Sequence, residues 1–279
     1  MTASHTSSPA LALAQRVTDR FAVIPHVEAV ALAGSRTSPF ADAQSDIDLY
    51  VYGTEIIPIP IRAEVARDAS RAEVGNAFWE PGDEWIDGET GISVDIMYRT
   101  PRWIKDQLDR SLVRHEASVG YSTCFWYNVL NSQPLFDRSG WFKTLQIQAS
   151  QPYPAELRHA IIAKNYPILR TNMSSYIHQI ELALQRGDGF SVNHRVTAML
   201  ASYFDILFAV NRQPHPGEKR LLWFAQDLCP RLPAGMAQDV GGLLSEVPHG
   251  AVIERVNAML DALDDLLRGE GILPASECR

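Results

Sequence analysis

Two aspartates in the segment 45–52 are the clearest candidates for chemistry in this sequence. If the segment is a strand, its side chains alternate between two faces, so Asp46 and Asp48 share one face and Ile47 and Leu49 the other. Two carboxylates side by side repel each other, and a divalent cation between them keeps both ionised. Oxygen ligands of this kind suit Mg²⁺, which completes its shell with water and substrate phosphates. The pair therefore predicts a magnesium site.

A third carboxylate, Asp95, lies in the alternating segment 91–99, on the face opposite Val94. If this second strand pairs beside the first, the three carboxylates of Asp46, Asp48 and Asp95 converge. Such a set suits two metal ions that bind the attacking and the leaving oxygens in phosphoryl or nucleotidyl transfer. We therefore predict that these three residues are catalytic and bind two Mg²⁺ ions.

The dipeptide Gly34-Ser35 follows an apolar run at 27–33 that predicts a buried strand. A glycine lets the backbone turn sharply and approach a ligand closely. Ser35 adds a hydroxyl and an N–H that would hold a phosphate group. The next residue, Arg36, is either a contact of a triphosphate or a solvated cation in a loop, and the sequence alone does not separate the two.

In their order along the chain, these features resemble the DNA polymerase β nucleotidyltransferase superfamily. In that superfamily a hydrophobic strand ends in Gly-Gly or Gly-Ser, the next strand opens with two acids one residue apart, and a later strand supplies a third acid. Gly34-Ser35, Asp46-x-Asp48 and Asp95 match that pattern. The resemblance implies ATP or another NTP as co-substrate, release of pyrophosphate and activation of the acceptor by Asp95. Glu89 is an alternative base.

The periodicity changes along the chain, and this change predicts the domains. From residue 101 onwards helical spacing prevails, and after residue 154 we expect only helices. We predict an α+β fold with an N-terminal nucleotidyltransferase-type mixed β-sheet flanked by helices, followed by a C-terminal all-α helical bundle. The expected catalytic domain covers residues 1–130, a proline- and glycine-containing hinge residues 131–153, and the bundle residues 154–279.

The expected elements follow from apolar spacing and breaker residues. In the N-terminal half we expect helices at 9–25, 61–71, 103–112 and 121–130, and short strands between 72 and 89 with turns at 81–83 and 87–88. Trp79 and Trp85 flank the first of these turns, so we expect them to pair across a hairpin. In the C-terminal half we expect a helix at 155–185 that is kinked or interrupted at Pro167, then helices at 191–210, 218–227, 234–246 and 251–267.

The helical half is similar in layout to that of two-domain antibiotic nucleotidyltransferases, in which a helical domain closes over the nucleotide. That similarity implies that Lys219 or Arg220, which lie beside His215 in a segment rich in breaker residues, contacts the triphosphate. The residues themselves are equally well explained as solvated charges at the start of a helix.

Charge and composition limit the partners. The 279-residue chain has a formal net charge of −8, and long nucleic acids bind through basic neutralisation of their phosphates, so we do not expect long DNA or RNA as a partner. An acidic surface favours a cationic acceptor such as an aminoglycoside, but the sequence does not identify the acceptor or the oligomeric state. The three cysteines show no metal-binding or redox spacing. With neither a signal peptide nor an apolar run long enough to span a membrane, we expect a cytoplasmic protein.

Two alternative interpretations remain beside the enzyme. The first is a catalytically silent nucleotide-binding protein, regulatory or antitoxin-like, that acts through a protein partner. The second treats Asp46, Asp48 and Asp95 as surface acids of an ordinary sheet. The complete carboxylate set behind Gly34-Ser35 favours a metal-dependent nucleotidyltransferase that moves an NMP group, most simply AMP from ATP, to an acceptor hydroxyl or phosphate.

Overall fold

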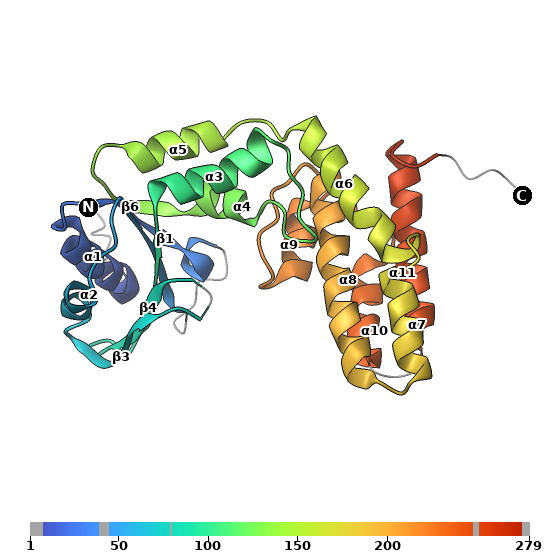
Figure 1. Ribbon diagram of the computed structural model, residues 1–279, viewed down its shortest axis with the longest axis horizontal. Helices are drawn as coiled ribbons and strands as arrows, with labels where there is room; N and C mark the ends of the chain where they lie inside the picture. Colours follow the sequence, from blue (N-terminus) through green and yellow to red (C-terminus); the bar gives the residue numbers. More distant parts are fainter. Residues whose placement is uncertain (1–7, 39–44, 79, 248–250, 275–279) are drawn as a thin grey trace, which may run out of the picture. The chain divides into compact units, whose positions relative to one another are not determined.

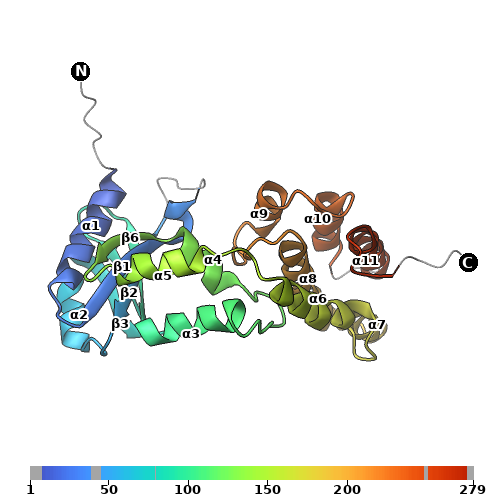
Figure 2. The same ribbon diagram turned by 90° about the horizontal axis from the view of Figure 1, so that it is seen from above.

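The computed structural model describes residues 8–38, 45–78, 80–247 and 251–274 (Figures 1 and 2). The chain forms two compact units. One consists of Met1–Leu108 with Asn128–Gln151, and the other of Asp109–Tyr127 with Pro152–Arg279. A mixed sheet in the first unit and helices in the second confirm the predicted α+β fold.

The first unit is built on a six-stranded sheet with the order β3-β4-β5-β2-β1-β6. Its strands are β1 (Val27–Ala33), β2 (Ile47–Gly53), β3 (Ala69–Asn76), β4 (Gly82–Asp87), β5 (Ser93–Arg99) and β6 (Gln133–Asp137). Neighbouring strands are antiparallel except β2 and β5, which are parallel in the described sheet. A parallel pair needs a crossover connection, and the segment from α2 (Ile59–Val65) through β3 and β4 supplies it.

One face of this sheet carries the core of the unit. Helices α1 (Pro9–Ala22) and α2 lie on that face. Ile47, Leu49 and Val51 of β2 are buried in this core. Because side chains alternate along a strand, the same pattern places Asp48 on the opposite face.

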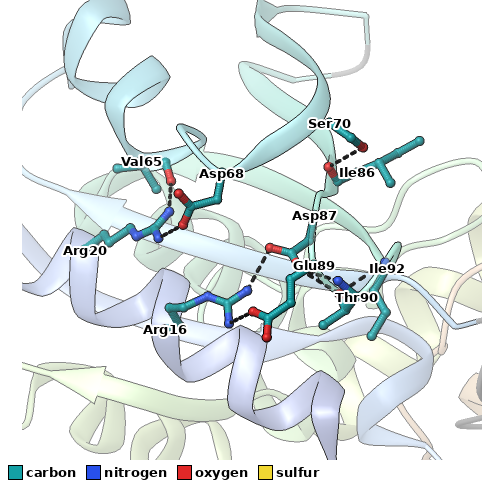
Figure 3. A network of polar contacts seen from close by, with 10 residues as sticks. All are labelled: Arg16, Arg20, Val65, Asp68, Ser70, Ile86, Asp87, Glu89, Thr90 and Ile92. Atoms are coloured by element: carbon teal, nitrogen blue, oxygen red, sulfur yellow. Dashed lines mark hydrogen bonds and ion pairs between the residues drawn. The ribbon is translucent and has the colours of Figure 1, made fainter.

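Two arginines of α1 form hydrogen bonds and ion pairs with residues of β4, α2 and the neighbouring loops (Figure 3). Arg16 donates to Asp87 at 2.8 Å and to Glu89 at 3.1 Å. Arg20 donates to the Val65 carbonyl at 2.6 Å and also pairs with Asp68. Although burial opposes it, hydrogen bonds from Thr90 and Arg16 lower the pKa of Asp87. Glu89, the alternative base in the sequence analysis, is thus paired with Arg16 of α1.

Helix α2 is shorter than predicted, and a buried ion pair holds it to β4. Arg62 of α2 donates its Nε–H to Asp83 Oδ2 at 2.9 Å and an Nη–H to the Gly82 carbonyl at 2.7 Å. Tyr98 donates to Asp83 at 2.5 Å. The predicted helix at 61–71 is confirmed as far as Val65, but its predicted end was wrong, and so was the predicted turn at 81–83. The chain leaves α2 after Val65 to form β3, and Asp83 lies within β4.

The pairing of Trp79 with Trp85 across a hairpin stays a prediction, because Trp79 lies outside the described residues. Trp85 is buried in β4, within the core cluster on the α1 face.

The segment 131–153, predicted as a hinge, contains β6 and α5 (Trp141–Ala149) and belongs to the first unit as far as Gln151. Pro134 lies in β6, an edge strand, where a missing N–H is tolerated. Gly140 is the N-cap of α5 with φ 73°. The Tyr52 ring packs against Trp141 and Phe142 of α5, so α5 covers part of the face that carries Asp48.

Helices make up the second unit. They are α6 (Ala155–Arg170), α7 (Tyr176–Gln185), α8 (Gly189–Val210), α9 (Leu221–Leu228), α10 (Met236–Glu246) and α11 (Val252–Gly269). Helix α8 packs against α6 and α7, and α10 packs against α11. The predicted break at Pro167 lies instead at 171–175. Pro167 is one turn from the end of α6, so it removes only one backbone hydrogen bond.

Two helices contain boundaries between the units, α3 (Pro101–Leu112) and α4 (Cys124–Asn131). Ser122 lies in the segment between α3 and α4. Its N–H donates to Asp205 of α8 at 3.0 Å, and its hydroxyl donates to the same carboxylate at 2.6 Å. Asn165 of α6 donates to Asp205 at 3.3 Å and accepts from the Gly120 N–H at 3.0 Å. These bonds hold the connecting segment to the helices of the second unit.

In the part of the chain that the structure describes, no helix is both long enough and apolar enough to cross a membrane.

Candidate active site

Asp48 and Asp95 lie opposite each other on adjacent parallel strands. The register pairs Ile47 with Val94 and Asp48 with Asp95. Ile47 and Val94 are fully buried on the core face, whereas both aspartates are half-buried. Residues in register on neighbouring strands share a face, so the two carboxylates leave the sheet side by side. The predicted adjacency of the two strands is confirmed.

The turn after β1 is built against Asp48. Ala33, the last residue of β1, pairs with Asp48, and Gly34 then begins a short 3₁₀ helix with φ +67°. A Cβ on Gly34 would lie 1.7 Å from Asp48 Oδ2. Glycine is therefore required for the approach of the Asp48 carboxylate as well as for the backbone angle.

Arg36 holds the start of β2 against this turn. Its Nε–H donates to the Asp46 carbonyl at 3.0 Å, and an Nη–H donates to the Ser45 carbonyl. The Ser35 carbonyl accepts from the Ser38 N–H at 3.0 Å and the Ser38 hydroxyl at 2.7 Å. The predicted nucleotide-binding residues Gly34, Ser35 and Arg36 thus form one turn beside Asp48. Their contact with a nucleotide stays a prediction.

Asp46 is more exposed than the pair and precedes β2. It lines a hollow of about 390 Å³ on the sheet face together with Asp95, Glu84, Glu73, Arg71 and Trp85. A volume of this size is within the range of small-molecule sites, roughly 300–1,000 Å³.

A row of four carboxylates crosses four neighbouring strands. Glu73 of β3 pairs with Glu84 of β4, Glu84 pairs with Asp95 of β5, and Asp95 pairs with Asp48 of β2. Arg71 pairs with Glu73 at 3.1 Å, but both side chains are exposed and such pairs contribute little. Glu73 and Glu84 are not predictable as site residues from the sequence, because their place in the row depends on the register of β3, β4 and β5.

An aromatic and cationic group lies further along β2 on the same face as Asp48. The Arg99 guanidinium lies 3.9 Å from the centre of the Tyr50 ring and bonds both oxygens of Glu80 at 2.6 and 2.8 Å. Asn128 donates to the Tyr50 hydroxyl at 3.0 Å. Burial raises the pKa of Tyr50, so its hydroxyl stays protonated. This packed group fixes the part of β2 that follows Asp48.

The donor set fits Mg²⁺ through a pair of carboxylates. The described residues contain no group of three or more His, Cys, Asp or Glu side chains placed to hold one metal ion. Mg²⁺ commonly takes only one or two protein carboxylates and completes its shell with water and phosphate oxygens. Half-buried Asp48 and Asp95 meet that requirement. Asp46 as a further ligand, and a second ion, stay predictions.

Lys219 and Arg220 belong to the second unit, where both are exposed just before α9. Arg220 is the N-cap of α9 with φ 53°. His215 beside them is buried, its Nδ1 accepts from the Gly217 N–H at 3.0 Å, and burial lowers its pKa to about 3. It is therefore a neutral core histidine. Contact of Lys219 or Arg220 with a nucleotide stays a prediction.

Comparison with known proteins gives distant structural similarities. No family model and no curated protein matches the chain. Among solved structures, the chain is similar to a nucleotidyltransferase-like protein from Exiguobacterium sibiricum 255-15, with 13% sequence identity and a TM-score of 0.43. The similarity covers 93% of this chain and 75% of that chain.

Proposed function

We propose that the protein is a metal-dependent nucleotidyltransferase that transfers an NMP group, most simply AMP from ATP, to a hydroxyl or phosphate of an acceptor. The observation that supports this function best is the in-register pair Asp48 and Asp95 beside the Gly34 turn. On an ordinary sheet surface, two half-buried carboxylates in register would repel each other without any compensating gain. Such a surface would also not require a glycine whose replacement is blocked by one of these carboxylates.

In this proposal Asp48 and Asp95 hold Mg²⁺, which would neutralise the triphosphate and the charge that develops on the leaving oxygen. The acceptor oxygen forms a bond to the α-phosphorus while the bond to the bridging oxygen of the β-phosphate breaks and pyrophosphate leaves. The acceptor proton passes to Asp95 and then to solvent. Asp95 lies between Asp48 and Glu84 in the carboxylate row, so a proton there relieves repulsion with both neighbours.

The remaining predicted residues have supporting roles. The turn of Gly34, Ser35 and Arg36 would face the triphosphate tail. Glu73 and Glu84 extend the negative charge along the hollow of about 390 Å³. This favours a small cationic acceptor, such as an aminoglycoside, over an acidic one.

The proposal is tested first by nucleotide binding. The melting temperature is measured with ATP, GTP, CTP and UTP, each with and without Mg²⁺. We expect at least one nucleotide to raise it in a Mg²⁺-dependent way in the wild type and in Glu64→Gln, a control with an exposed acid on α2. Asp48→Asn should lose the response. No response to any nucleotide contradicts the proposal.

Transfer is tested next with nucleotide labelled at the α-phosphate and a panel of cationic, neutral and phosphorylated acceptors. We expect label to appear on one acceptor class and pyrophosphate to be released in equal amount. Nucleotide binding without transfer to any acceptor would instead support the regulatory alternative.

A further inference from the structure

A group of arginines in the second unit carries more positive charge than its protein partners neutralise. Arg158 of α6 and Arg231, which follows α9, share one carboxylate oxygen, Oε2 of Glu270, at 3.5 and 2.7 Å. Asn211 accepts from the Arg231 N–H at 2.9 Å and donates to the Arg231 carbonyl at 2.7 Å. The positive charge of the adjacent Arg212 acts on Arg158. Three positive charges and one negative charge leave +2 in a chain whose net charge is −8.

Arg158 uses few of its donors. A guanidinium has five N–H donors, yet the side chain, which is largely buried, makes a single bond of 3.5 Å to Glu270 among the described residues. Its Nε is buried without an acceptor in the same part of the chain. Burial, followed by the positive charges of Arg212 and Arg231, lowers the pKa of Arg158. An anion beside this group would offset the repulsion among the three arginines and would accept hydrogen bonds from the unused N–H donors of Arg158.

Arg212 occupies a backbone position that favours glycine. It follows the C-cap of α8 with φ 55°. Its N–H donates to the Ala209 carbonyl at 3.1 Å and the Gln213 N–H to the Phe208 carbonyl at 3.0 Å, which is the Schellman pattern of helix ends. Arginine is strained here, and its guanidinium has no hydrogen bond or ion pair with the described residues.

We propose that Arg158, Arg212 and Arg231 bind a phosphate group of a small phosphorylated molecule. The planar guanidinium matches phosphate oxygens through paired hydrogen bonds. One phosphate dianion balances the net charge of +2 that Glu270 leaves. The overall charge of −8 disfavours a long nucleic acid as the source of the phosphate. This site lies entirely within the second unit and does not depend on the proposed activity of the first.

The test is calorimetric titration of the full chain with inorganic phosphate at constant ionic strength. We expect saturable binding with a Kd of about 1 mM or below. Arg212→Asn should weaken it about tenfold or more, because a charged hydrogen-bonding group is lost. The same variant should melt at a higher temperature without phosphate, because asparagine tolerates a positive φ.

Arg186→Asn is the matched control, because Arg186 is an exposed arginine at the C-cap of α7 and the variant loses the same charge. It should bind phosphate as the wild type does. Glu270→Gln provides a change of opposite sign, since it removes the carboxylate that competes for Arg158 and Arg231, and it should bind phosphate several-fold more tightly. Absence of saturable binding, equal loss in Arg186→Asn, or a folded Glu270→Gln that binds no more tightly would overturn the proposal.

Discussion

Replacement of Gly34 by alanine tests the link between the turn and Asp48. The new Cβ would lie 1.7 Å from Asp48 Oδ2 and 2.5 Å from its Cγ, whereas ordinary contacts begin at 3.4 Å. The carboxylate oxygen must therefore move by 3.4 − 1.7 = 1.7 Å, or the turn must shift by a similar distance. The first movement displaces the Asp48 carboxylate from its place beside Asp95, and the second moves the Gly34 turn away from Asp48.

Two effects of this substitution have separate magnitudes. A non-glycine residue at φ +67° costs about 1–2 kcal/mol in the free energy of unfolding. A displacement of about 1 Å in a catalytic group lowers the rate by roughly 10²-fold. We therefore expect Gly34→Ala to lose modest stability in urea denaturation and at least two orders of magnitude in the rate of labelled NMP transfer.

Gly140→Ala separates the two effects. Gly140 has φ +73° in the same unit, and a Cβ there would meet nothing within 4 Å. This control should lose similar stability and keep its transfer rate. A Gly34→Ala protein that transfers at close to the wild-type rate would refute the placement of Asp48 in the reaction, and an equal rate loss in Gly140→Ala would refute the local explanation.

Two further predictions concern buried charges. Asp83→Asn leaves the buried Arg62 without its carboxylate and should lower the free energy of unfolding by about 3–5 kcal/mol in urea denaturation; a loss below about 1 kcal/mol would contradict the buried ion pair. Burial raises the pKa of Asp205 to about 7 from 3.8 and lowers that of His215 to about 3 from 6.5. On folding, Asp205 therefore takes up a proton and His215 releases one between roughly pH 4 and 6, so their effects on stability cancel there. Relative to the wild type, the free energy of unfolding of Asp205→Asn should rise with pH by about 1.4 kcal/mol per unit over that range, and a difference that does not change with pH would contradict the assignment.

The strands that carry the candidate site were predictable because their patterns are local. Apolar residues alternate with Asp48 in β2 and with Asp95 in β5, and the strand at Val27–Ala33 was predicted at its observed bounds. Most helices of the second unit were predicted within a few residues for the same reason. Apolar periodicity reports which face of an element is buried, and that face is largely set by the segment itself.

Features that depend on partners distant in the sequence were not predictable. The pairing of Arg62 with Asp83 places a charge of α2 in the interior, and no local pattern shows where α2 must end. Glu73 and Glu84 join the carboxylate row only through the register of β3, β4 and β5. From the sequence, the need for glycine at position 34 is attributed to the close approach of a ligand. The structure adds a second reason, the Asp48 carboxylate, which lies fourteen residues away in the sequence (48 − 34).

The most direct test of the central claim is nucleotide-dependent binding of Mn²⁺, measured by electron paramagnetic resonance with a non-hydrolysable ATP analogue. We predict that the wild type binds Mn²⁺ together with the analogue, and that Asp48→Asn and Asp95→Asn each weaken this binding by about tenfold or more while remaining folded. Wild-type affinity for Mn²⁺ in both folded variants would contradict the claim that these two carboxylates hold the catalytic metal.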